Sequence, residues 1–261
     1  MGISIRGLAT AFRTLSIISW PGKESDDLSS SLPWFPIAGL VLGLILYAIA
    51  RALMALPFTL WASGTALIIL AAEVWLTRGL HLDGLADWAD SLGGILQREK
   101  RLAIMKDTNV GVFGVLALIL ALAAKWLAFE RLLASGSIVW LLAALILSRG
   151  MMVELITTLP YARTGEGMGR AFVKGASQGH RFVSLALCLL FCLPFGPFGL
   201  VLFVLAGIVT RLFRARCQKG FGGITGDLLG TANEMIEICL LMVCALPGKG
   251  ILSYTGWNWV F

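Results

Sequence analysis

Residues 111–129 read GVFGVLALILALAAKWLAF, an apolar run whose one charged side chain is Lys125. An uninterrupted run of about 20 apolar residues crosses the hydrocarbon core of a bilayer as an α-helix. Six further runs share this character: Trp34–Leu56, Ala62–Leu76, Ile138–Leu159, Phe182–Leu193, Phe198–Phe213 and Met235–Leu246. Of the 261 residues, 58% are hydrophobic and only 14% are charged. The sequence therefore predicts an all-α, polytopic integral membrane helical bundle with about seven transmembrane spans, forming one domain over residues 1–261.

The distribution of lysine and arginine predicts the orientation of these spans. Most of the 21 basic residues lie in the N-terminal segment and after the second, fourth and sixth runs. Cytoplasmic loops carry an excess of such residues, so we expect the N-terminus in the cytoplasm. The expected location of the protein is the cell (inner) membrane. The net charge of +6 then reflects topology, and no nucleic-acid partner is expected. The first residues, with Arg6 and Arg13 between apolar positions, predict an amphipathic helix at the membrane interface.

Three aspartates follow the second run in the stretch HLDGLADWAD, residues 81–90. Asp83, Asp87 and Asp90 are four and three residues apart, a spacing that places their carboxylates along one stripe of a helix. Like charges at this spacing repel. A hard divalent cation, Mg²⁺ or Mn²⁺, would offset them and leave coordination sites for phosphate. We interpret the stripe as a metal site, with a solvated helix face as the alternative.

A second acidic cluster lies in GGITGDLLGTANEMIE, residues 222–237, at the start of the last run. Asp227 and Glu234 are further candidate metal ligands. Glycines leave the backbone open to a ligand, and backbone amides at a helix start suit phosphate. The substrate-binding candidates in this stretch are Gly223, Thr225, Gly226 and Asn233. A loop that simply leads into a helix is the alternative interpretation.

Cationic side chains lie between these clusters. Lys106 could clamp a phosphate and Asp107 could complete a metal site, although a basic flank that anchors the third span explains them equally well. Arg149 lies within the fourth run, so we expect it to face the bundle interior and pair with a phosphate or with Glu73 or Glu154. A purely structural ion pair with either glutamate explains Arg149 equally well. The remaining substrate-binding candidates are His81, Arg163 and Arg170.

All of these glycine-rich, charged segments fall on the predicted cytoplasmic side, which indicates an active site facing the cytoplasm. Clustered carboxylates, a divalent metal and several cations suit phosphoryl or nucleotidyl transfer. The sequence contains no Walker loop, no serine-hydrolase elbow and no nicotinamide fingerprint, which argues against an ATP-driven machine.

Taken together, the motifs resemble those of the cobalamin synthase family, in the same order and at similar spacing. They are HLDGLADWAD, the segment Met105–Gly114, SRG at Ser148–Gly150, YARTGEGMG and GGITGDLLGTANE. The resemblance covers almost the whole chain. Two features depart from the family pattern. The third segment of the family often reads M-R-D-S-R-I/L-G, where this chain has Lys106, Thr108 and Asn109, and the glycine that usually follows the third aspartate is Ser91.

The resemblance implies an Mg²⁺-dependent membrane transferase that joins alpha-ribazole, or its 5'-phosphate, to adenosylcobinamide-GDP and releases GMP. This reaction is the final nucleotide-loop assembly of vitamin B12. The implied partners are the corrinoid nucleotide, the ribazole substrate and the lipid bilayer. A homo-oligomer and contacts with other cobalamin-pathway enzymes are open alternatives. Two other functions also stay open: a CDP-alcohol phosphotransferase, whose aspartates are spaced differently, and an ion-coupled transporter, which would carry polar residues near the midplane of several spans.

We therefore predict that Asp83, Asp87, Lys106 and Arg149 act in catalysis. One or two Mg²⁺ ions would be held by Asp83, Asp87, Asp90, Asp227 and Glu234. A ribose hydroxyl would attack the phosphorus on the cobinamide side, while the cations stabilise the leaving phosphate.

Overall fold

The computed structural model describes residues 5–56, 61–94, 97–165 and 167–247, and its regular structure is helical. Within these residues the α-helices are α1 (Ile5–Leu15), α2 (Phe35–Met54), α3 (Ala62–Thr77), α4 (Leu80–Asp90), α5 (Arg98–Ile104), α6 (Val112–Ala134), α7 (Leu141–Thr158), α8 (Met168–Gly175), α9 (Gln178–Cys192), α10 (Gly196–Phe221) and α11 (Gly226–Ala245). Short 3₁₀ segments, η1 (Leu28–Trp34), η2 (Ile138–Trp140) and η3 (Leu193–Phe195), precede α2, α7 and α10. The predicted all-α class is confirmed.

Five helical segments are long and apolar enough to cross a membrane: Leu28–Met54, Val112–Ala134, Ile138–Thr158, Gln178–Phe221 and Gly226–Ala245. Helices α3 and α4 pass the same test only as a pair, and they are bent by 88° at the break between them. The protein is thus a multi-pass membrane protein, as predicted. The count of seven spans and the cytoplasmic N-terminus stay predictions.

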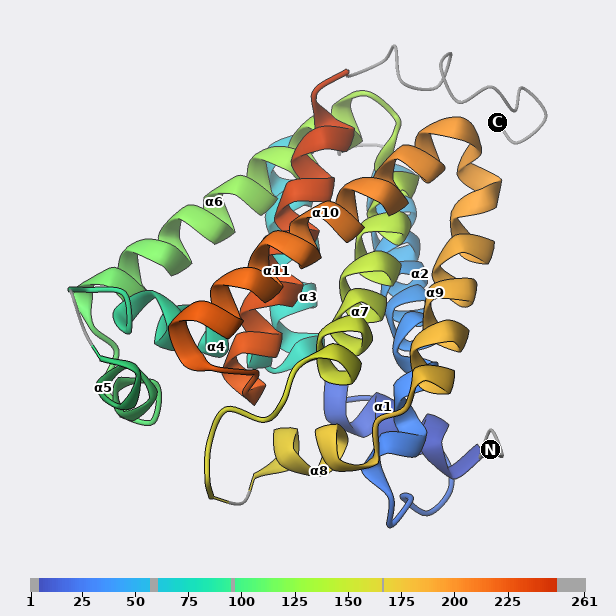
Figure 1. Cartoon of the computed structure of the whole chain (residues 1–261). Helices are drawn as coiled ribbons and strands as arrows, with labels where there is room; N and C mark the ends of the chain where they lie inside the picture. Colours follow the sequence, from blue (N-terminus) through green and yellow to red (C-terminus); the bar gives the residue numbers. More distant parts are fainter. Residues whose placement is uncertain (1–4, 57–60, 95–96, 166, 248–261) are drawn as a thin grey trace.

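Two of the predicted runs, Phe182–Leu193 and Phe198–Phe213, lie in helices that follow each other without a loop between them. Helices α9 and α10, joined by η3, together span 44 residues. An α-helix rises about 1.5 Å per residue, so a straight helix of this length would be roughly twice as long as the hydrocarbon core is thick. In Figure 1 the chain turns sharply at this break, and α10 leads back toward the end of the bundle from which α9 starts.

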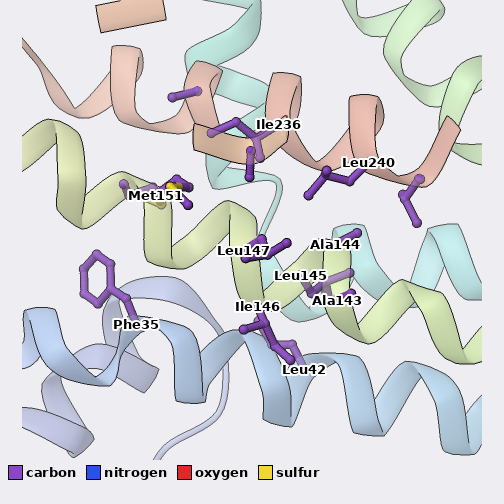
Figure 2. Close-up of a cluster of buried hydrophobic side chains, with 14 of the residues drawn as sticks. Phe35, Leu42, Ala143, Ala144, Leu145, Ile146, Leu147, Met151, Ile236 and Leu240 are labelled. Atoms are coloured by element: carbon purple, nitrogen blue, oxygen red, sulfur yellow. The ribbon is translucent and has the colours of Figure 1, made fainter. Parts of the chain in front are cut away.

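Helix α7 forms the centre of the bundle, and every residue from Leu141 to Val153 is buried. Figure 2 shows α7 between α2 and α11, with Leu42 of α2 and Ile236 of α11 in the same apolar cluster. The approach of α2 depends on glycine, because a Cβ at Gly39 would lie 2.4 Å from the carbonyl oxygen of Leu145. Small residues allow such close backbone packing between membrane helices.

The N-terminal helix α1 packs on the rest of the protein. Ala9, Phe12 and Leu15 on its apolar face are buried, and Phe12 stacks on Trp20 with ring centroids 4.8 Å apart. The predicted amphipathic helix is therefore present. Its apolar face is covered by protein, and its location at the membrane interface stays a prediction.

The predicted motifs lie at one end of the bundle. Arg78 and Gly79 adopt left-handed backbone conformations, with φ of 57° and 63°, and this turn directs α4 away from the axis of α3. Figure 1 shows α4, α5, α8 and α1 at the same end of the molecule, whereas the C-terminal end of α11 lies at the opposite end. The helical order of the chain thus brings distant polar segments together.

Candidate active site

Helices α4 and α11 approach each other closely at Gly84. A Cβ at this position would lie 2.5 Å from the carbonyl oxygen of Asp227. The hydroxyl of Thr231 also donates a hydrogen bond of 2.9 Å to the carbonyl oxygen of Gly84. The glycine in HLDGLAD therefore sets the distance between the two acidic motifs. It places Asp83 and Asp87 of α4 beside the first turn of α11.

The carboxylates of these two helices affect one another. Helix α4 is not one of the five segments that are long and apolar enough to cross a membrane by themselves. Burial, followed by the negative charges of Asp83 and Asp227, raises the pKa of Asp87 to about 7, while the positive charge of Arg163 acts in the opposite direction. Mutual repulsion of this kind is relieved when a cation or a proton enters the cluster. The predicted juxtaposition of Asp83, Asp87 and Asp227 is present in the fold.

Arg163 connects three of the sequence motifs. Its Nη2 atom donates a hydrogen bond of 2.7 Å to the Asp227 carboxylate and one of 3.2 Å to the carbonyl oxygen of Met105. The loop that carries Arg163 is itself held by backbone hydrogen bonds, since the Ala162 amide donates to the Ile224 carbonyl at 2.9 Å. The arginine is thereby fixed at the entrance to α11, next to the acidic cluster.

A cavity of about 260 Å³ lies beside these residues. Its lining includes six residues that the sequence predicts for the site: His81, Asp83, Lys106, Arg163, Gly226 and Asp227. The polar residues Thr14 and Tyr161, which the sequence interpretation missed, line it as well. Part of its apolar lining comes from α2, α7 and α8: Phe35, Met152, Ile156 and Phe172. A concave apolar site with a few convergent polar groups is the usual form of a small-molecule site. The structure therefore gathers carboxylates, cationic side chains and an imidazole around one space.

Asp90, a predicted metal ligand, has a different set of partners. Its carboxylate accepts hydrogen bonds from the backbone amides of Gly111 at 2.7 Å and Gly114 at 2.8 Å. A Cβ at Gly111 would lie 2.5 Å from the Asp90 carboxylate. Asp90 thus satisfies amide groups at the start of α6, where unpaired N–H groups need an acceptor. The close approach of the carboxylate explains why this chain has glycine at positions 111 and 114.

Glu234, the other outlying metal candidate, belongs to a buried ion cluster around Lys125. The Lys125 ammonium lies 2.8 Å from Glu73, 2.8 Å from Glu234 and 2.6 Å from Glu237. The lysine and all three glutamates are nearly inaccessible. The sequence interpretation missed the role of Lys125, although an ionisable residue inside an apolar run is itself a signal.

Arg149 belongs to the same cluster. Its side chain is fully buried and forms an ion pair with Glu237, and it also donates a hydrogen bond of 2.9 Å to the Ser148 hydroxyl. The partners expected from sequence are corrected, because Glu73 binds Lys125 and Glu154 forms an ion pair of 2.5 Å with Arg181. The interior position of Arg149 is confirmed, and its ion pair with Glu237 agrees with the structural alternative. Its role in catalysis stays a prediction.

The segment around Asp107 is exposed and internally hydrogen-bonded. The Asn109 backbone amide donates to the Asp107 carboxylate at 3.0 Å, and the Asn109 side-chain amide donates to it at 2.8 Å. These bonds, the backbone one first, lower the pKa of Asp107. Asn109, which departs from the family pattern, therefore holds the turn around Asp107.

The remaining predicted residues divide between structural and exposed positions. The Thr225 hydroxyl accepts a hydrogen bond of 3.2 Å from the Leu228 amide and begins α11. Gly223 has φ of 157°, and a Cβ there would lie 2.1 Å from the Pro160 carbonyl oxygen. Asn233 is fully buried beside Glu234. Arg170 is exposed, and its guanidinium donates to the Thr164 carbonyl at 3.2 Å.

The donor set can be compared with what Mg²⁺ requires. Among the described residues, no three histidine, cysteine, aspartate or glutamate side chains lie close enough to form a complete metal site. Mg²⁺, however, is commonly held by one or two carboxylates together with phosphate and water oxygens. The carboxylates of Asp83 and Asp227 are hard donors that line one cavity, and Asp87 lies near enough to both for their charges to raise its pKa. Their chemistry fits an Mg²⁺ ion that arrives with a phosphate-bearing substrate.

The fold and this site define a polytopic helical membrane protein with a carboxylate- and cation-lined cavity at one end, suited to phosphoryl-transfer chemistry. The model of the family described as cobalamin-5-phosphate synthase matches residues 7–245, and the chain belongs to this family. The family resemblance inferred from the motifs is therefore confirmed.

Individual relatives agree with this assignment. The chain is 42% identical over 235 residues to an adenosylcobinamide-GDP ribazoletransferase of Prosthecochloris aestuarii, covering 88% of this chain and 94% of the relative. It is 42% identical over 256 residues to the enzyme of the same name from Chlorobaculum parvum, covering 95% and 98%. For the one from Syntrophobacter fumaroxidans, the identity is 38% over 243 residues, covering 92% and 97%. No solved structure matches the chain. None of these relatives is named as a CDP-alcohol phosphotransferase or a transporter.

Proposed function

We propose that the protein is an adenosylcobinamide-GDP ribazoletransferase. It joins alpha-ribazole, or its 5'-phosphate, to adenosylcobinamide-GDP and releases GMP, which completes the nucleotide loop of vitamin B12. The observation that carries the proposal is the single cavity on which Asp83, Asp227, Lys106 and Arg163 converge. Relatives that share about 40% of its residues over most of the chain carry this name, which supports the same activity here.

The side chains of the cavity divide into two roles. A carboxylate of the α4–α11 cluster accepts the proton of the ribose hydroxyl, which then attacks the phosphorus on the cobinamide side. Lys106 and Arg163 hold the diphosphate and stabilise the charge that develops on the departing GMP. The apolar walls exclude water, which would otherwise compete as the nucleophile.

Asp83, Asp87 and Asp227 would hold Mg²⁺ at this site. When bound, the ion neutralises charge on the diphosphate and orients it for displacement. We propose that the end of the bundle with this site faces the cytoplasm and that the protein lies in the inner membrane. Polar substrates that carry hydroxyl and phosphate groups can then reach the site from water. Association into a homo-oligomer or with other enzymes of the pathway stays a prediction.

A turnover assay with the reconstituted protein tests the function. Protein in liposomes is supplied with adenosylcobinamide-GDP and alpha-ribazole 5'-phosphate, with and without Mg²⁺, and products are separated by chromatography. We expect equal amounts of GMP and adenosylcobalamin phosphate, formed only with the metal. A folded protein that yields neither product under any divalent metal would contradict the proposal.

A further inference from the structure

A second cavity of about 370 Å³, more open to solvent and lined mostly by exposed residues, lies next to the first. Helix α5 and the loop after α7 form its walls, and Arg98 fixes them together by donating a hydrogen bond of 2.8 Å to the Ala162 carbonyl. Lys106 and Arg163 line both cavities. Two spaces of similar size therefore share a boundary at the two cations that suit a diphosphate.

We infer that the two cavities bind the two nucleosides of the reaction separately. The first cavity binds the acceptor nucleoside, and the second binds the guanosine nucleotide that leaves. The diphosphate then lies at the boundary, against Lys106 and Arg163. This inference rests on the proposed function, because it names where each substrate of that reaction binds. It follows from the geometry of phosphoryl transfer, in which the attacking and leaving oxygens lie roughly in line on opposite sides of the phosphorus.

The charges of the two cavities give the direction of the transfer. Asp83 and Asp227 line the first cavity, and a hydroxyl nucleophile needs a nearby carboxylate to take its proton. In the second cavity Arg98 joins the two shared cations, and Glu99 is the one acidic residue among its described lining. The leaving phosphate gains negative charge as its bond to phosphorus breaks, so the more basic cavity stabilises it.

The chemistry of the two bases agrees with this direction. The bicyclic base of ribazole carries methyl groups and no N–H donor, which matches apolar walls such as Phe35 and Phe172 in the first cavity. Guanine presents adjacent N–H donors that a carboxylate accepts in pairs. Glu99 can supply that acceptor in the second cavity.

The step is balanced within these two spaces. The ribose oxygen forms a bond to the phosphorus on the cobinamide side, and the bridging oxygen leaves with the electron pair as part of GMP. The hydroxyl proton passes to a carboxylate at the wall of the first cavity. GMP then departs from the second cavity without crossing the nucleoside site.

Two matched variants test the inference, since each adds one bulky side chain to an exposed residue that lines only one cavity. Ala103→Trp narrows the second cavity and Met168→Trp narrows the first. Isothermal titration with GMP and with alpha-ribazole, each in the presence of Mg²⁺, measures the dissociation constants. We expect Ala103→Trp to weaken GMP binding about 10-fold or more while alpha-ribazole binding is retained, and Met168→Trp to do the reverse.

A third variant keeps the inference testable if a tryptophan variant fails to fold. Glu99→Gln, which keeps the size of the side chain, should weaken GMP binding and leave alpha-ribazole binding unchanged. The opposite selectivity in the tryptophan pair, or equal loss of both ligands in each variant, would overturn the inference. Turnover by the wild-type protein is measured in the same preparation. If the wild type is active, a result that overturns the inference leaves the proposed function standing.

Discussion

Arg163 and Asp227 are 64 positions apart in the chain, yet their side chains form an ion pair with 2.7 Å between Nη2 and Oδ2. The pair joins the loop after α7 to the first turn of α11. It also stands at the boundary of both cavities, because Arg163 lines each of them. The relationship shows how the YARTGEGMG and GGITGDLLGTANE motifs form one site.

Replacing Arg163 by glutamine should remove a charge that stabilises the diphosphate while it is cleaved. Loss of one such donor costs about 10²- to 10³-fold in turnover in well-studied enzymes, and we expect a similar loss here. The side chain is partly exposed, so the protein should still fold. Steady-state kinetics in liposomes, with thermal unfolding as the control, measures both effects. Full activity in folded Arg163→Gln would show that this arginine does not contact the diphosphate.

Gly84→Ala should separate α4 from α11. The new Cβ would meet the Asp227 carbonyl oxygen at 2.5 Å, which neither backbone can relieve without shifting. Overpacking of this kind costs about 1–3 kcal/mol, and the shift should lower turnover further by moving the aspartates. Gly207→Ala on α10 is the matched control, because a Cβ there has no atom within 4 Å. The two variants should differ clearly in melting temperature and activity; equal behaviour would refute the close contact.

Lys125→Met should destabilise the bundle strongly, because it leaves three buried glutamates without their shared cation. Breaking a buried ion pair by removing one partner costs about 3–5 kcal/mol. Lys219→Met changes an exposed lysine on α10 and should have little effect. Thermal unfolding in detergent compares the two. Unchanged stability in Lys125→Met would mean that the cluster contributes nothing to the fold.

The pKa of Asp87 leads to a pH dependence that Mg²⁺ should alter. Because this pKa is raised to about 7, the carboxyl group binds a proton below that pH and loses its negative charge. Turnover at low Mg²⁺ should therefore fall as the pH drops through 7. Metal and proton compete for the same oxygens, so more Mg²⁺ should move the fall to lower pH. An acid limb that is insensitive to Mg²⁺ would argue against Asp87 as a ligand.

Much of the site could be predicted from local spacing. The one-turn separation of Asp83 and Asp87 predicts that their carboxylates lie on one stripe of a helix. Both residues do lie on α4, beside the first turn of α11. The spacing also predicts that Asp90 joins Asp83 and Asp87 as a metal ligand. In the structure its carboxylate instead accepts hydrogen bonds from the backbone amides of Gly111 and Gly114. Backbone hydrogen bonds between distant segments leave no charge pattern in a sequence.

The buried ion cluster illustrates a second limit. Lys125 and Arg149 are both visible as charges in apolar runs, but an interior position is predicted only for Arg149, from the cost of charge in lipid. Their partners did not follow, because pairing depends on how α3, α6, α7 and α11 are rotated against one another. The span count has the same difficulty at Pro194–Pro197, where apolar content alone cannot tell one broken helix from two spans.

The most direct test of the central claim compares Asp87→Asn with Asp26→Asn in the liposome turnover assay. Asp87 belongs to the acidic cluster at the cavity, whereas Asp26 is exposed near the N-terminus. We predict that Asp87→Asn, still folded in the membrane, releases no measurable GMP from adenosylcobinamide-GDP, and that Asp26→Asn matches the wild type. Near-normal GMP release by Asp87→Asn would contradict the placement of the reaction at the junction of α4 and α11.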